Sequence, residues 1–288
     1  MDVELIEDRK RKIVERFGPW SAHNIRLEGD VYTISKAVVG DEIKLRRVLQ
    51  CVSDIARRPL ASLRVLDLAC LEGLYAVEFA RHGAHVLGIE VRAANIEKAR
   101  FAKEVLALDD LELVQDDVRS LSKEKYGCFD VVLCLGILYH LDVPDVFSFL
   151  EQITEVCQDF VLIDTHVGMP ERSCLYKGRQ YWGSAYKEHD ADSTSAIRAN
   201  QLWASFDNPV SFWFTRASLF NALSHVGFTS IYECHMPFEP SKPDDRVTLL
   251  AMKGQRRDLL CTPLLNAQPM EDLAEKVDHP SVHQAPAQ

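Results

Sequence analysis

The sequence predicts an α/β fold with a doubly wound, mainly parallel seven-stranded sheet. From residue 64 to residue 165, apolar runs alternate with amphipathic helical patterns, and strands that alternate with helices pack in parallel through right-handed crossovers. Acidic residues stand at or just after three of these runs, at Asp67, Glu90 and Asp117. Because parallel strands end side by side along one edge of a sheet, these carboxylates are expected to surround one nucleoside-bearing ligand, as in a Rossmann-like site.

The individual elements follow from hydrophobic periodicity and from stop signals such as Gly18-Pro19 and Pro59. Helices are expected at residues 2–17, 41–57, 74–81, 92–106, 143–156 and, behind a Thr215 cap, 217–225. Strands are expected at residues 64–68, 85–90, 111–115, 130–135, 160–165, 228–235 and 246–253, with a proline-rich turn at 237–243 between the last two.

Residues 167–212 interrupt the alternation and are rich in aromatic side chains. An insertion of this length is rarely an idle loop, so we expect it to cover a substrate. The sequence is therefore divided into an N-terminal helical and cap segment, 1–58, a cofactor-binding core, 59–166, a substrate-cap insertion, 167–212, the C-terminal part of the core sheet, 213–254, and a flexible tail, 255–288.

Composition narrows the class of partner and the compartment. The 288 residues carry a net charge of −10, which makes a nucleic-acid partner unlikely because such proteins usually present a basic face. The eight cysteines form no C-x-x-C pair, residues 1–16 lack an apolar signal core, and no apolar run is long enough to span a bilayer. We expect a reduced, cytoplasmic, soluble protein that could form a homodimer.

The turn after the first core strand lacks most of the glycines that nucleotide-binding turns use. At Asp67-x-Ala69-x-Leu71-x-Gly73 only the last of three expected positions is glycine, and G-x-G-x-x-G and P-loop patterns are absent. This disfavours NAD(P) and FAD, and so a dehydrogenase. A ligand without a pyrophosphate tolerates a looser turn, and S-adenosylmethionine is such a ligand.

Residues 65–141 resemble the core of class I S-adenosylmethionine-dependent methyltransferases, small-molecule type. In that family Asp67, Ala69, Cys70 and Gly73 belong to the first motif, which contacts the methionine portion of the cofactor. The resemblance further implies that Glu90 binds both ribose hydroxyls, that Asp117 and Val118 meet the adenine, and that Leu135 lies beside the amino acid part. It implies S-adenosyl-L-methionine as cofactor and S-adenosyl-L-homocysteine as product.

Three histidines are candidate bases for deprotonating a methyl acceptor: His140 after the fourth core strand, His166 after the fifth, and His23 in the N-terminal segment. A structural role is an open alternative for each, such as capping the next helix for His140. Asp164 and His166 could bind a metal ion, but one Asp-x-His pair is weak support, and we expect no metal.

Five aromatic residues are candidates to bind a planar substrate, although each could equally belong to a core. They are Trp20, Tyr139, Tyr181, Trp182 and Trp203.

The leading hypothesis is methylation of a small molecule, most readily at oxygen, in secondary metabolism. The loop at residues 136–140 also resembles that of bacterial wobble-uridine tRNA alkyltransferases, which leaves RNA modification as an alternative. A catalytically silent scaffold is a third hypothesis, suggested by the missing glycines and opposed by the retained Asp67, Glu90 and Asp117.

Overall fold

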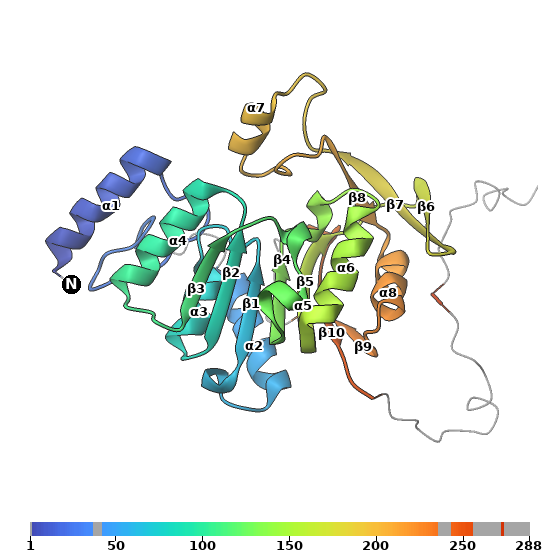
Figure 1. Cartoon of the computed structure of the whole chain (residues 1–288), viewed down its shortest axis with the longest axis horizontal. Helices are drawn as coiled ribbons and strands as arrows, with labels where there is room; N and C mark the ends of the chain where they lie inside the picture. Colours follow the sequence, from blue (N-terminus) through green and yellow to red (C-terminus); the bar gives the residue numbers. More distant parts are fainter. Residues whose placement is uncertain (1, 37–41, 236–242, 256–271, 274–288) are drawn as a thin grey trace, which may run out of the picture.

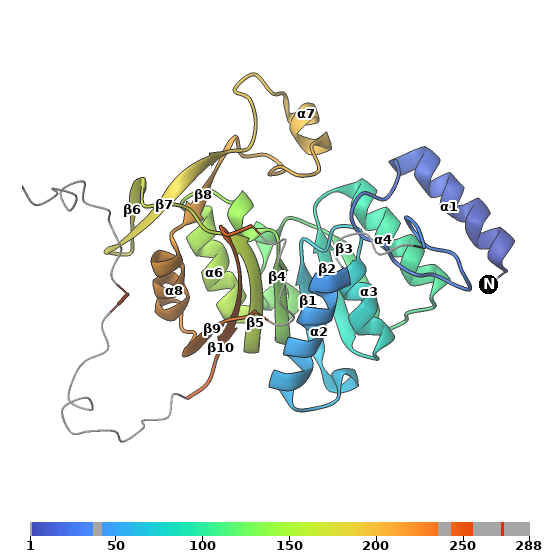
Figure 2. The same cartoon turned by 180° about the vertical axis from the view of Figure 1, so that it is seen from behind.

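The computed structural model describes residues 2–36, 42–235, 243–255 and 272–273. Its centre is a seven-stranded sheet in the order β3-β2-β1-β4-β5-β10-β9, in which β1 to β5 are parallel and β10 is antiparallel to both of its neighbours (Figures 1 and 2). The predicted fold class is therefore confirmed. The strands are β1 Arg64–Leu68, β2 His85–Glu90, β3 Leu111–Gln115, β4 Phe129–Leu135, β5 Cys157–His166, β9 Ser230–Glu233 and β10 Arg246–Met252.

Helices cover both faces of this sheet. One apolar core lies under α1 to α4 and takes in Val65 of β1, while the other lies under α6 and α8 and takes in Leu66. Successive side chains of a strand point to opposite faces, so a strand buried on both sides is apolar throughout. The helices are α1 Val3–Phe17, α2 Glu42–Ala56, α3 Leu74–Arg81, α4 Ala93–Val105, α5 Lys123–Tyr126, α6 Asp145–Val156 and α8 Arg216–His225, with short 3-10 turns η1 Leu60–Ser62, η2 Val118–Ser120 and η3 Leu138–His140.

Strand register aligns the three acidic strand ends. Asp67 of β1 is opposite Gly88 of β2, and Glu90 of β2 is opposite Gln115 of β3, two residues before Asp117. The carboxylates therefore meet at the carboxyl edge of the sheet, as the alternating pattern predicted.

The turn after β1 keeps a glycine-like backbone without the glycines. Ala69 and Leu71 have φ angles of 53° and 50°, and Gly73 has 88°. Side chains with a Cβ atom adopt this left-handed region only at an energetic cost of about 1–2 kcal/mol per residue. A Cβ atom on Gly73 would lie 2.8 Å from that of Ala99 in α4, so this one position admits glycine alone.

The insertion folds into a small sheet that the sequence did not predict. Its strands, β6 Arg172–Tyr176, β7 Arg179–Lys187 and β8 Val210–Phe214, form an antiparallel sheet, with α7 Ser195–Asn200 in the long connection between β7 and β8. In Figure 1 this connection rises above the main sheet with α7 at its far end. β8 crosses the boundary expected at residue 212, and Phe212 N donates to Leu141 O, which ties the small sheet to η3.

Most of the turn expected at 237–243 and most of the tail expected at 255–288 lie outside the described residues. Within the tail, Leu273 exchanges two hydrogen bonds with Asn221 of α8, and Asp272 pairs with His225.

Candidate active site

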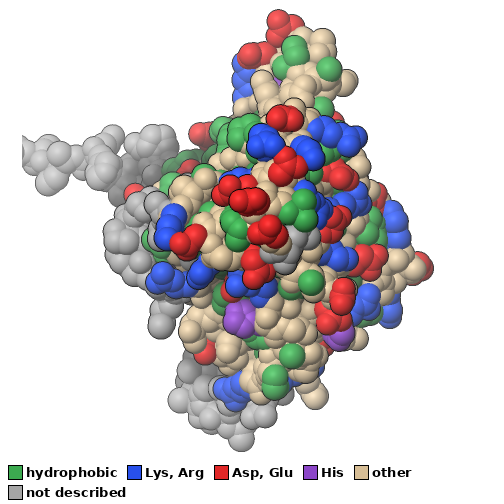
Figure 3. Space-filling model, turned by 90° about the vertical axis from the view of Figure 1, so that its left-hand side faces the viewer, with side chains coloured by type: hydrophobic (Ala, Val, Ile, Leu, Met, Phe, Trp, Pro, Cys, Tyr) green, Lys and Arg blue, Asp and Glu red, His purple; other side chains and the backbone are tan. Residues whose placement is uncertain are grey.

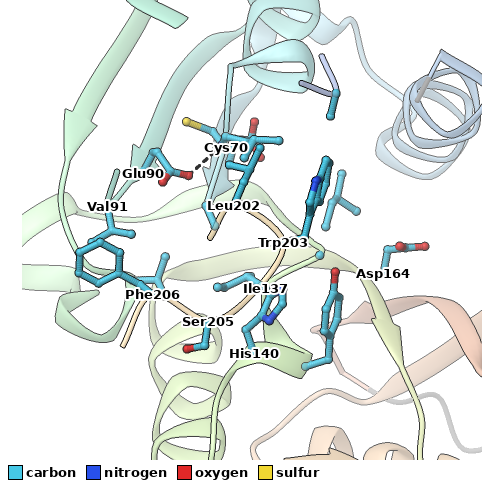
Figure 4. A pocket seen from close by; sticks show the side chains of 18 of the residues that line it. Cys70, Glu90, Val91, Ile137, His140, Asp164, Leu202, Trp203, Ser205 and Phe206 are labelled. Carbon is cyan, nitrogen blue, oxygen red and sulfur yellow. Dashed lines mark hydrogen bonds between the residues drawn. The ribbon is translucent and has the colours of Figure 1, made fainter. Parts of the chain in front are cut away.

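A cavity of about 490 Å³ opens at the carboxyl edge of the main sheet. Figure 4 shows Glu90 and Cys70 on one side of it, Asp164 on another, and His140 near Ile137. We call the part around Glu90 and Asp117 the cofactor end, and the part around His140 and Asp164 the acceptor end. Of the eight residues expected to bind the cofactor, all except Gly73 line the cavity: Asp67, Ala69, Cys70, Glu90, Asp117, Val118 and Leu135.

Glu90 is held in place by the backbone on both sides of the cofactor end. Its Oε2 accepts from Leu71 N at 3.1 Å and its Oε1 from Arg92 N at 2.8 Å. Burial raises the pKa of this carboxyl, while the bonds from Arg92 and Leu71 act in the opposite direction. Each carboxylate oxygen has further acceptor capacity, so Glu90 fits a pair of ribose hydroxyls.

Asp67 lies fully buried beneath the same turn. It accepts a hydrogen bond from Ala76 N at 3.1 Å. Burial, together with the nearby charge of Glu90, raises the pKa of Asp67 to about 7 although the bond from Ala76 lowers it. A cationic group next to Asp67 would favour its charged form.

Asp117 is bound by an arginine two residues later. Arg119 donates its backbone N–H to Asp117 Oδ1 at 2.9 Å, and its Nη2 reaches Asp117 Oδ2 at 2.6 Å. The expected contact of Asp117 with an adenine amino group would therefore be made by a carboxylate that Arg119 already orients.

The N-terminal segment is bound to the cofactor turn through Glu72. This fully buried carboxylate accepts from the backbone N–H groups of Ser21, Ala22 and His23, at 2.9 to 3.2 Å, and pairs with Lys98 at 3.0 Å. As the sequence suggested, the segment reaches the site, since Ala22 and His23 line the cavity.

His23 is poorly suited to act as a base. Its Nδ1 accepts from Leu74 N, at the start of α3, at 3.1 Å. A neutral imidazole that accepts at Nδ1 carries its proton on Nε2, so neither nitrogen of neutral His23 offers a lone pair to a substrate.

His140 lines the cavity and is paired with a buried glutamate. Its Nδ1 lies 2.9 Å from Oε1 of Glu188, whose side chain is fully buried. Ser211 Oγ donates to the same oxygen at 2.7 Å, and Ser205 N donates to Oε2 at 2.9 Å. Burial alone would raise the pKa of Glu188, but His140, Ser205 and Ser211 bring it below its usual value. Glu188 thus fixes the proton of neutral His140 on Nδ1, and leaves Nε2 as the acceptor.

His166 lies behind Tyr139 and is not part of the cavity wall. Its ring stacks on Trp213 at 4.7 Å and meets Tyr139 edge-on at 4.8 Å. Burial and the neighbouring Arg246 lower the pKa of His166. The prediction of His166 as a base is therefore corrected: with Trp213, whose Nε1 donates to Tyr139 O at 2.9 Å, it supports the Tyr139–His140 turn.

Basic side chains surround Asp164 at the acceptor end. Arg246 contacts its Oδ1 at 2.6 Å, and Lys44 and Arg47, both from α2, lie 3.5 and 3.6 Å from the carboxylate. All three line the cavity. Within the described ranges no group of three or more His, Cys, Asp or Glu residues could hold a metal ion. Asp164 instead forms ion pairs with these three basic side chains.

Three of the five aromatic candidates lie away from the cavity, while Tyr139 and Trp203 line it. Trp20 is buried against Phe101 of α4, 5.7 Å between ring centroids. Tyr181 is buried, and its hydroxyl lies 2.8 Å from His225 Nδ1 of α8. Trp182 is hydrogen-bonded through its backbone to Ser218 of α8. The expectation of substrate contact for these three is corrected, because none of them lines the cavity.

Three residues of the site, Glu188, Arg92 and Arg119, are not predicted from the sequence. Glu188 occurs between Lys187 and His189, where a buried carboxylate cannot be distinguished from a solvated one. A signal did exist for the arginines, since each stands two residues after a cofactor acid, in Glu90-Val91-Arg92 and Asp117-Val118-Arg119.

Comparison with known families agrees with this geometry. A family model described as "Methyltransferase domain" matches residues 65–159, from β1 into β5. Residues 65–159 therefore match a methyltransferase domain, in agreement with the resemblance to class I S-adenosylmethionine-dependent methyltransferases.

Curated relatives match part of the chain. A ubiquinone biosynthesis O-methyltransferase of Acinetobacter baylyi is 37% identical over 108 residues, 38% of this chain and 43% of that protein. The corresponding enzyme of Paracidovorax citrulli is 33% identical over 93 residues, 32% of this chain and 38% of that protein. The match thus spans less than half the length of these relatives.

Solved structures share the fold over more of the chain. The N-terminal domain of EvdMO1, determined in the presence of S-adenosylhomocysteine and D-fucose, covers 88% of this chain and 98% of its own, with a TM-score of 0.67 and 24% identity. A 1,6-didemethyltoxoflavin-N1-methyltransferase of Burkholderia thailandensis covers 75% and 80%, with a TM-score of 0.54 and 18% identity.

Proposed function

We propose that the methyltransferase transfers a methyl group to an oxygen atom of a small-molecule acceptor, with His140 as general base. The observation that carries this proposal is the pairing of His140 Nδ1 with Glu188 at 2.9 Å, at the acceptor end of the cavity. A hydroxyl nucleophile needs deprotonation, and histidine is the side chain most often used for it.

Each residue of the pair has a separate task in this mechanism. Bound S-adenosylmethionine supplies an electrophilic methyl group on a sulfonium sulfur. His140 Nε2 takes the proton of the acceptor hydroxyl as the oxygen becomes nucleophilic, and Glu188 stabilises the resulting imidazolium. Burial raises the pKa of Tyr139, so its hydroxyl remains a neutral donor that can orient the acceptor, and Trp203 covers the cavity. Alignment of this kind is the main contribution an enzyme can make to methyl transfer.

Two further observations support the proposal. The cavity volume of about 490 Å³ lies in the range typical of small-molecule sites. The curated relatives named above are O-methyltransferases, and one structural neighbour was determined with a hydroxyl-bearing sugar.

The test is methyl transfer from radiolabelled S-adenosylmethionine to a panel of phenols, sugars, carboxylic acids and amides. We expect turnover of hydroxyl acceptors, greatly slowed in His140→Gln with S-adenosylhomocysteine affinity retained. His85→Gln is the matched control, because His85 is exposed at the start of β2. Turnover confined to amides or carboxylic acids, or a fully active His140→Gln enzyme, would refute O-methylation by a histidine base.

RNA modification remains the second candidate on the strength of the loop at residues 136–140. On the face shown in Figure 3, basic and acidic side chains are intermingled rather than gathered into a basic stripe, so this face presents no basic surface to RNA. Transfer RNA in the same panel distinguishes the two, since its methylation with no small-molecule turnover would support the alternative. Failure of S-adenosylmethionine to bind would instead support the scaffold hypothesis.

The remaining expectations belong to the same proposal: metal independence, a cytoplasmic location, a role in secondary metabolism and a homodimer. Turnover should be unchanged by EDTA. In the part of the chain that the structure covers, no helix is long and apolar enough to cross a membrane.

A further inference from the structure

One segment of the insertion covers the cavity, and we call residues 199–207 the lid segment. Six consecutive residues of it line the cavity: Leu202, Trp203, Ala204, Ser205, Phe206 and Asp207. Figure 4 shows the labelled members Leu202, Trp203, Ser205 and Phe206 crossing between Glu90 and His140. The side chain of Trp203 is also 69% exposed, so the lid segment lies between the cavity and solvent.

Arg92 binds the lid segment by three hydrogen bonds to its backbone. Its Nε donates to Ala199 O at 3.2 Å, and its Nη2 donates to Gln201 O at 3.0 Å and to Ala204 O at 2.9 Å. The guanidinium also lies 5.4 Å from the ring centroid of Phe206. The backbone N–H of the same arginine donates to Glu90, so one residue contacts both the ribose-binding acid and the lid.

Arg119 repeats this arrangement at the next strand. Its Nη2 contacts Asp117 Oδ2 and also Asp207 Oδ2 of the lid segment, both at 2.6 Å. Its backbone N–H donates to Asp117. Acid-Val-Arg units at the ends of β2 and β3 therefore attach the same lid segment to the two acids expected to hold the adenosine.

The lid segment also contacts the catalytic pair. Ser205 N donates to Glu188 Oε2 at 2.9 Å, and His189 contacts Gln201 Oε1 at 2.5 Å and Ser205 O at 2.7 Å. Just beyond it, Asn208 Nδ2 donates to His140 O at 2.5 Å. Displacement of the lid segment would therefore remove a hydrogen bond from Glu188.

We propose that Arg92 and Arg119 are positioning residues that latch the lid segment over the cofactor, and that cofactor binding favours the latched state and thereby holds Glu188 against His140. The closed lid segment offers the cofactor the apolar surfaces of Leu202 and Phe206, which an open one does not. A ligand shifts an equilibrium toward the state for which it has additional contacts. The inference rests on cofactor binding alone and does not require that the acceptor be an alcohol.

Asp207→Asn tests the latch from the side of the lid, because Asp207 contacts Arg119 but neither Glu90 nor the catalytic pair. Asp145→Asn is the matched control: Asp145 also contacts Arg119, at 3.5 Å, but belongs to α6. The first measurement is the dissociation rate of S-adenosylhomocysteine by stopped-flow tryptophan fluorescence. We expect dissociation about three- to tenfold faster in Asp207→Asn, a larger effect in Arg92→Met, and the wild-type rate in Asp145→Asn.

The second measurement is trypsin cleavage after Arg198, whose guanidinium donates to Asp207 O at 2.8 Å. S-adenosylhomocysteine should slow this cleavage in the wild type and protect Asp207→Asn much less, at an unchanged unfolding midpoint. A third readout is the pair of ring nitrogen chemical shifts of His140 by NMR, assigned with His140→Gln, which should change on S-adenosylhomocysteine binding because Ser205 N donates to the Glu188 carboxylate that contacts His140 Nδ1. Cleavage insensitive to S-adenosylhomocysteine, or wild-type release from both latch variants, would overturn the latch. Unchanged chemical shifts of the His140 ring would overturn its link to the catalytic pair.

Because S-adenosylhomocysteine alone is the probe, these outcomes stand whether or not an oxygen acceptor is found. Failure of the latch leaves the proposed base unaffected, and failure of O-methylation leaves the latch unaffected.

Discussion

Replacing Glu188 by glutamine separates its charge from its shape and is the sharpest test of the proposed base. The glutamine side chain retains a carbonyl oxygen that can accept from His140 Nδ1 and Ser211, but the position of Oε2 then carries an NH₂ group that faces the N–H of Ser205. A hydrogen bond to a charged partner contributes about 1.5–3 kcal/mol. The imidazolium of His140 forms only as the proton is transferred, so Glu188 stabilises the transition state more than the ground state. Loss of this charged hydrogen bond should therefore lower kcat by about 10- to 150-fold.

The unmet donor of Ser205 adds a separate effect on stability. A buried donor without an acceptor destabilises a protein by about 1–3 kcal/mol, so Glu188→Gln should unfold at lower denaturant concentration. Activity must therefore be measured well below the unfolding transition. The affinity for S-adenosylhomocysteine reports whether the site is otherwise intact.

The assay is kcat and KM against one acceptor for the wild type, Glu188→Gln, His140→Gln and the double variant. Residues that act as a unit are strongly non-additive, so the double variant should be no slower than His140→Gln. If the two losses instead multiply, or if Glu188→Gln keeps a wild-type kcat, Glu188 does not act through His140. Burial tends to raise the pKa of Glu188 and His140 holds it low, so removing His140 should raise that pKa.

Three further predictions concern the cofactor end. Glu90→Ala should weaken S-adenosylhomocysteine binding by about 1–3 kcal/mol in a calorimetric titration, and unchanged affinity would remove Glu90 as the ribose ligand. The pKa of Asp67 is raised to about 7. If the ammonium group of the cofactor lies beside Asp67, cofactor binding favours the charged carboxylate and releases protons near pH 7. The binding enthalpy should then depend on the ionisation enthalpy of the buffer, and a buffer-independent enthalpy would contradict this. Ala69→Gly should raise the free energy of unfolding by about 0.5–1 kcal/mol, because φ is 53° at Ala69; a lower denaturation midpoint would contradict the strain.

The sequence predicts the main sheet well because its signals are local. Strands β1, β2 and β3 have the expected bounds, and β5 is longer than expected at both ends, since it begins at Cys157, directly after α6, and ends at His166. The cofactor acids are predictable for the same reason, since the carboxyl ends of parallel strands lie along one edge of the sheet. The conformation of the glycine-poor turn is not predictable from local sequence. Ala69 and Leu71 adopt the positive φ angles of the missing glycines, and the packing around the turn imposes this conformation.

The acceptor end is less predictable because long-range contacts build it. Tyr181 and Trp203 are both aromatic residues of the insertion, yet Tyr181 packs on α8 and Trp203 lines the cavity. What separates them is the path of the chain after β7, and composition does not encode that path. The burial of Trp20 is equally hard to predict, because it depends on a contact with Phe101 of α4, far along the chain.

The insertion serves two requirements of methyl transfer at once: covering the methyl donor and positioning the base. If two separate loops served them, the two would be independent of each other. A sulfonium donor must be kept from water, and a hydroxyl acceptor must meet its base in one protonation state. The carboxylate that fixes the tautomer of His140 follows β7 directly, and the lid segment that covers the cofactor donates its Ser205 N–H to that carboxylate. Under the latch proposal, the lid segment moves when the cofactor exchanges, and this movement withdraws the Ser205 N–H donor from Glu188. The base is therefore fully assembled only while the donor site is covered, which links removal of the acceptor proton to the presence of a methyl group that can be transferred.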